Sequence, residues 1–99
     1  MKKFFLFARA AIYRALYRLN RKKSLQYLLE LASVYEQLGL YFRAARIYYR
    51  TIRDHPKDPR GYYGVAILHD NRKRYTKAIH WYQKALEANP EFVPAWFFM

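Results

Sequence analysis

The chain matches itself when it is shifted by 34 positions, and this self-similarity constrains its fold more than any other feature of the sequence. Small residues recur in the same register, because Ala32 matches Ala66 and Ala44 matches Ala78. The aromatic and proline positions that recur with them are Tyr41 and Tyr75, Tyr48 and Tyr82, and Pro56 and Pro90. Such joint recurrence is typical of an array of small structural units, each stacked on the next.

Each unit contains two stretches with helical spacing of apolar residues. The first unit has Leu28, Leu31, Ala32, Tyr35 and Leu38, followed by Tyr41, Ala44, Ala45, Tyr48 and Ile52. Gly39 lies between the stretches, where the end of a helix favours a residue that tolerates positive φ. Asp58 and Pro59 predict an N-cap and the first residue of the next helix. A unit is therefore a helix, a tight turn, a second helix and a break marked by proline.

This pattern resembles the tetratricopeptide repeat, which combines a large aromatic residue, small residues, tyrosines and a proline within 34 residues. The first repeat, residues 25–58, carries Leu28, Leu31, Ala32, Tyr35, Gly39, Ala44, Tyr48 and Pro56. The second, residues 59–92, carries Tyr62, Val65, Ala66, His69, Ala78, Tyr82, Ala85 and Pro90. The sequence departs from the pattern at Leu28, Thr51, His69 and Lys73. The resemblance implies an all-α fold of stacked helical hairpins, forming a short right-handed α-solenoid.

The two ends fit the repeat less well. Residues 1–24 predict a basic amphipathic helix, from about residue 4 to 20, that caps the array with an apolar stripe. The stripe consists of Phe5, Ala8, Ile12, Ala15, Leu16 and Leu19. Residues 25–99 form the repeats, and Trp96 begins a truncated third unit. The truncation leaves three alternatives: a fragment of a longer protein, a short cap, or a contact with another copy. Candidates for self-association are Phe4, Phe5, Phe7, Trp96, Phe97 and Phe98.

Nothing in the sequence predicts catalysis, a cofactor or a metal site. Cysteine is absent, and His55, His69 and His80 are not spaced to share a metal on one helix. We expect His69, which replaces a tyrosine of the repeat pattern, to be a partly buried packing residue. The seven acidic residues are scattered, and no glycine-rich loop could hold a phosphate. We predict a non-enzyme in the cytoplasm, since no segment has the apolar length of a membrane span or secretory signal; organelle targeting stays open.

The resemblance also implies a groove lined by the first helix of each repeat. Its residues are Gln26, Leu29, Ser33, Glu36 and Gln37 in the first repeat, and Arg60, Tyr63, Ile67, Asp70 and Asn71 in the second. This mixture of apolar and polar side chains suits an extended peptide or a partner helix. Some family members hold a peptide's terminal carboxylate with Lys and Asn, but Leu29 and Ser33 occupy the matching positions here.

A basic face is predicted on the second helices, which the resemblance places on the convex side. Arg43, Arg46, Arg50 and Arg53 are spaced 3, 4 and 3 residues apart, and Lys77, His80 and Lys84 follow one period later. Nineteen basic residues against seven acidic ones give a net charge of +12. Such a face favours acidic partners, although it is also compatible with a solvated surface.

The N-terminal segment offers a second function. Residues 1–24 contain eight basic residues and no acidic one, so they carry most of the net charge. A basic amphipathic helix with Phe4, Phe5 and Phe7 can bind an acidic membrane surface. Its stripe is also needed to cover the first repeat, and one stripe cannot do both, so we expect packing.

The sequence therefore predicts a protein–protein interaction module that binds a peptide or partner helix, preferably an acidic one, and that can self-associate. The alternative is binding of an anionic surface, acidic membrane or nucleic acid, through the N-terminal helix and the basic face.

Overall fold

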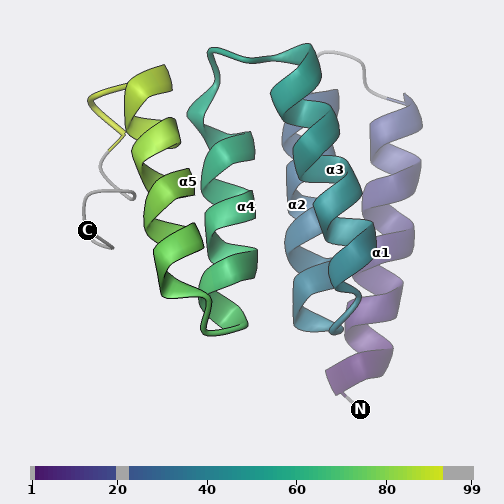
Figure 1. Cartoon of the computed structure of the whole chain (residues 1–99). Coiled ribbons are helices and arrows are strands. Elements are labelled where there is room, and N and C mark those ends of the chain that lie inside the picture. Colours follow the sequence, from purple (N-terminus) through teal and green to yellow (C-terminus); the bar gives the residue numbers. More distant parts are fainter. Residues whose placement is uncertain (1, 20–22, 93–99) are drawn as a thin grey trace. The chain divides into compact units, whose positions relative to one another are not determined.

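The chain folds into five consecutive α-helices in the computed structural model, which describes residues 2–19 and 23–92 (Figure 1). These are α1 (Lys2–Leu19), α2 (Ser24–Gln37), α3 (Tyr41–Asp54), α4 (Pro59–Asn71) and α5 (Tyr75–Ala88). Helix α1 packs on α2, and α4 packs on α5. The predicted all-α fold of helical hairpins is confirmed. The chain forms two compact units, residues 1–47 and 48–99, with the division inside α3.

The small residues of the repeat lie in the cores of the two units, as predicted. Ala32 and Ala44 are fully buried in the first unit, together with Leu31 and Val34. In the second unit Ala66, Ala78, Tyr82 and Ala85 form one buried cluster. A methyl group at these positions lets neighbouring helices approach closely, and the tyrosines fill the space beyond. The hydroxyl of Tyr82 donates a hydrogen bond to Asp70 Oδ2 at 3.2 Å.

The ends of the helices also follow the predicted signals. Gly39 has φ of 77°, and the turn closes where the Leu40 amide donates to the Tyr35 carbonyl at 2.8 Å. Asp58 caps α4 by accepting a hydrogen bond from the Arg60 amide at 3.0 Å, with Pro59 as the first helical residue. Lys73 stands where Gly39 stands one repeat earlier, and its backbone takes the same left-handed conformation, with φ of 60°.

The prediction for the packed face of α1 is wrong. The predicted stripe points outward: Phe5, Ile12 and Leu19 are 62%, 56% and 82% exposed. The side chains of α1 that are buried or half-buried are Leu6, Ala10, Tyr13, Leu16 and Tyr17, so Leu16 alone of the stripe is covered. The ring of Tyr13 stacks on Tyr27 of α2 at 6.5 Å.

The physical reason is the repeat register. Ala10 is 34 positions before Ala44 and 68 before Ala78, and all three are buried. Neighbouring helices can approach α1 closely only where its side chain is small, as at Ala10. Helix α1 therefore packs through the face that carries Ala10, although its opposite face is more apolar. The predicted third unit, with Trp96, Phe97 and Phe98, lies outside the described residues.

Candidate interaction surfaces

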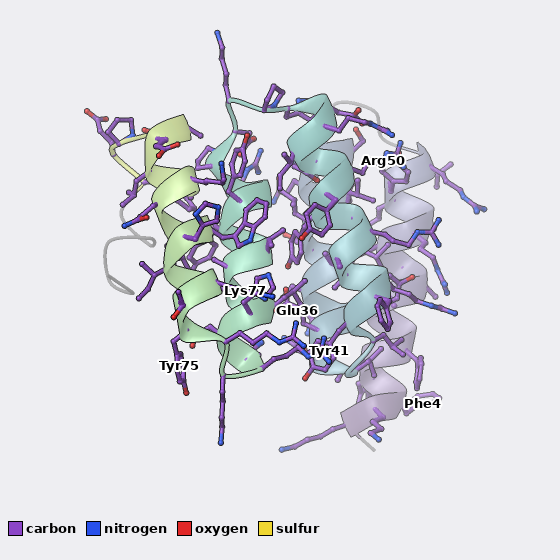
Figure 2. The ribbon with its side chains drawn as sticks, in the orientation of Figure 1. Phe4, Glu36, Tyr41, Arg50, Tyr75 and Lys77 are labelled. Carbon is purple, nitrogen blue, oxygen red and sulfur yellow. The ribbon has the colours of Figure 1, made fainter. Side chains whose placement is uncertain are left out.

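The predicted groove residues of the first repeat share one side of α2. Gln26, Ser33 and Gln37 are exposed, whereas Leu29 and Glu36 are half-buried (Glu36 is labelled in Figure 2). The Gln26 amide donates to Glu30 Oε1 at 3.4 Å, a long hydrogen bond along the helix surface. This side of α2 therefore presents amide and hydroxyl groups beside one apolar side chain, a combination that can bind a peptide backbone.

The predicted groove residues of the second repeat lie on α4, and most of them take part in contacts within their own unit. The ring of Tyr63 lies 5.7 Å from that of Tyr82 and 5.3 Å from that of Phe92. Ile67 packs against the same buried cluster, and Asp70 accepts the hydrogen bond from Tyr82. Because Phe92 covers part of Tyr63, the side of α4 is less open to a ligand than that of α2. Asn71 is exposed.

Arg60, the fifth groove residue of this repeat, is held by the residue that caps α4. Its guanidinium donates from Nη2 to Asp58 Oδ2 at 2.7 Å and from Nε to Oδ1 at 3.0 Å. These hydrogen bonds lower the pKa of the Asp58 carboxyl below its usual value. Asp58 thus has two roles, since the same carboxylate satisfies the first turn of α4 and fixes the direction of the Arg60 side chain.

The arginine face of α3, which we define as Arg43, Arg46, Arg50 and Arg53, is exposed along its length (Arg50 is labelled in Figure 2). Asp54 partly neutralises its C-terminal end, with an oxygen 3.0 Å from Arg53 Nε and another 3.6 Å from Arg50 Nε. The hydrogen bond from Arg53, assisted by the charge of Arg50, lowers the pKa of Asp54. Arg43 lies 5.9 Å from the centre of the Tyr35 ring. Within the described part of the chain, Arg46 makes no salt bridge.

The basic residues predicted one period later lie on α5. Lys77 and His80 are exposed and Lys84 is half-buried (Lys77 is labelled in Figure 2). The ring of His80 meets Trp81 edge to face at 5.8 Å. The net positive charge of this surface is smaller than that of the α3 surface, because α5 also carries Glu87 beside Lys84.

One open hollow in the second unit has no counterpart among the sequence-based predictions. It has a volume of about 680 Å³ and lies between the turn before α4 and the segment after α5. Its lining includes His55, Lys57, Asp58, Asn89 and Phe92. Among the described residues, no group of histidines and acidic residues is arranged to hold a metal ion. Asp58, the carboxylate among the described residues that line the hollow, already accepts hydrogen bonds from Arg60.

The packing of the helices, the turns between them and the 34-residue recurrence define a helical repeat protein in which each repeat is a hairpin of two helices. The chain belongs to the tetratricopeptide repeat family, whose model matches residues 7–59 and 29–91. Repeats of this family are protein–protein interaction modules and are typically non-catalytic, and no catalytic family is found in the chain. The first match begins inside α1, in agreement with the buried position of Ala10.

Comparison with curated proteins gave no match. None of the described helices has the length and apolar character needed to cross a membrane.

Proposed function

We propose that this module binds an acidic peptide or partner helix, and that the groove residues of α2 make the direct contacts. The observation that carries the proposal is the charge of the arginine face. All four arginines are exposed, and Asp54, which forms salt bridges with Arg50 and Arg53, lies at the C-terminal end of α3. The positive potential that remains attracts acidic chains, raises the rate of encounter and disfavours basic partners.

The side of α2 supplies the chemistry of contact. Gln26, Ser33 and Gln37 offer donors and acceptors for a peptide backbone, and Leu29 offers an apolar contact. Tyr63 and Ile67 serve mainly to support the core, because both pack on the buried cluster of the second unit.

The test is selection of ligands from a random peptide library displayed on phage, followed by binding measurements with the selected peptides. We expect enrichment of Asp and Glu among them. A Ser33→Tyr variant, which places a bulky ring on an exposed position of α2, should weaken binding at least tenfold. The matched control is Gln83→Tyr, at an exposed position of α5. Equal affinity for wild type and Ser33→Tyr, or selection of basic peptides, would contradict the proposal.

The contribution of the arginine face is measured separately through rates. Arg46→Glu with Arg50→Glu should slow association by about tenfold at low salt and leave dissociation nearly unchanged. Lys2→Glu with Lys3→Glu changes the net charge equally on α1 and serves as the control. If both double variants slow association to the same degree, net charge alone attracts the peptide and the arginine face has no special role.

A further inference from the structure

Helix α1 has two apolar faces, and only one of them packs against other described residues of the chain. Leu6, Ala10, Tyr13 and Tyr17 are covered. The outer face, which we define as Phe5, Ala8, Ile12, Ala15 and Leu19, is exposed along the whole helix. These five residues are spaced 3, 4, 3 and 4 apart, which places them in one stripe. One stripe could not serve both packing and membrane binding, but among the described residues α1 packs through its other face, so the outer face is available to a membrane.

The charged residues of α1 are all basic. They are Lys2, Lys3, Arg9, Arg14 and Arg18, and all five are exposed. At the step of about 100° per residue in a helix, Arg9 and Lys2 lie about 40° and 60° beyond Phe5 on one border of the outer face, and Arg18 lies about 60° beyond Ala15 on the other. Arg14 and Lys3 lie farther round the helix, toward its packed face. Phe4 and Phe7 add further exposed rings at the first turns of the helix, where Figure 2 shows Phe4. An apolar ridge thus runs between two cationic borders.

We propose that the outer face of α1 binds the surface of a membrane that contains anionic lipids. The apolar side chains enter the boundary between headgroups and acyl chains, and the arginines and lysines on either side reach the phosphate and carboxylate groups of the lipids. Five cations in an 18-residue helix make a crossing orientation unfavourable, so α1 lies parallel to the membrane plane. The opposite face of α1 keeps its contact with α2.

Charge and apolar surface together favour anionic lipid over a second copy of the chain or nucleic acid as the ligand of the outer face. A second copy would bring its own Lys2, Arg9 and Arg18 against the same borders, and like charges at an interface are repulsive. An acidic protein would also be attracted by these cations, as we propose for the arginine face, and the vesicle experiment below distinguishes it from lipid. Nucleic acid would use the cations but would leave Phe5, Ile12 and Leu19 in water. Anionic lipid matches both the ridge and its borders.

The test is co-sedimentation of the full chain with vesicles of phosphatidylcholine alone and of phosphatidylcholine mixed with phosphatidylserine. We expect binding to the mixed vesicles that weakens as salt is raised, and little binding to the neutral ones. Phe5→Ser with Ile12→Ser should weaken binding at least tenfold, because both side chains are removed from the lipid contact. The matched control is Phe42→Ser, which removes an 85% exposed phenylalanine from α3 and should change nothing.

Two further measurements keep the result unambiguous. Circular dichroism checks that each variant retains its helices, and Phe5→Trp should show a blue-shifted fluorescence with mixed vesicles only. No binding of the wild-type chain to mixed vesicles would overturn the proposal, as would equal losses for the Phe42 variant. A dimer in solution that Phe5→Ser with Ile12→Ser converts to a monomer would overturn it as well, because the outer face would then belong to a second copy.

Discussion

Helices α1 and α3 occupy the same register of the repeat, and the two helices agree on one side and differ on the other. Ala10 of α1 and Ala44 of α3 are 34 positions apart, and both are buried. On the outward sides, Ile12 corresponds to Arg46 and Leu19 to Arg53, so an apolar ridge replaces an arginine face. Helix α5 continues the series with Ala78 inside and His80 outside.

The comparison separates two kinds of constraint. A position where helices meet accepts only a small side chain, since any added volume must displace a close-packed neighbour. A position that faces outward has no such restriction and can take the chemistry of whatever binds there. In our proposals the same helical repeat therefore carries a lipid-binding face on α1 and, on α3, a face that attracts acidic chains.

The largest change in the free energy of unfolding should come from enlarging a buried side chain. Ala78→Leu should overpack the cluster around Tyr82 and lower the free energy of unfolding by about 1–3 kcal/mol. The same change at an outward position, Ala15→Leu, should alter it by less than about 0.5 kcal/mol. Urea denaturation of both variants checks this, and equal losses would show that inward and outward positions do not differ as described.

A smaller change in the free energy of unfolding is expected at a helical glycine where a side chain would not fit. A Cβ on Gly64 of α4 would overlap the ring of Tyr48, which is itself buried. Overpacking outweighs the gain of about 1 kcal/mol in helix propensity, so Gly64→Ala should destabilise the chain by about 1–2 kcal/mol. In a Tyr48→Leu background the same change should cost less, and an unchanged cost would show that the ring is not the obstacle.

The two turns between paired helices allow a finer comparison. Lys73 adopts the left-handed backbone that Gly39 adopts one repeat earlier. This conformation is unfavourable for a residue with a Cβ, so Lys73→Gly should raise the free energy of unfolding by about 0.5–1 kcal/mol. Gly39→Ala should lower it by about 1 kcal/mol, although its Cβ would meet no neighbour. Thermal unfolding of both variants measures the difference, and changes of the same sign would contradict it.

The smallest effect concerns pH. Burial of His69, together with the charges of Lys77, Arg74 and Arg72, lowers the pKa of its imidazole. The folded state therefore binds fewer protons than the unfolded state, so this contribution to stability is complete above about pH 6.5 and declines as the pH falls below it. Denaturation between pH 8 and 5 should show a decline that His69→Gln reduces. A decline of the same size in the variant would assign it to other groups.

The sequence was sufficient for the hairpins, because each has its own local signals. Gly39 marks a turn, Asp58 and Pro59 start a helix, and the buried alanines recur at the repeat period. The partly buried state of His69 was predicted as well. These features depend on residues that are neighbours in the chain or are one period apart.

The packed face of α1 was not predictable from apolar spacing alone. Both faces of this helix are apolar, and the richer one, with Phe5 and Ile12, is the one left outside. The contact with α2 is decided by Ala10, whose importance appears only when the repeat register is extended backward. Likewise, Gly64 is needed because the ring of Tyr48, on another helix, occupies the space of a Cβ, and no local sequence pattern reveals this contact.

Thiol labelling can show which face of α1 is packed, because the sequence contains no cysteine and each introduced thiol is read alone. Ala10→Cys and Ile12→Cys introduce single thiols two residues apart, and their rates of reaction with a maleimide are compared without lipid. We expect the thiol at position 12 to react nearly as fast as in the unfolded chain, and the thiol at position 10 to react about tenfold more slowly. Fast labelling at position 10 with protection at position 12 would contradict this expectation, because α1 would then pack through the stripe that we assign to the membrane.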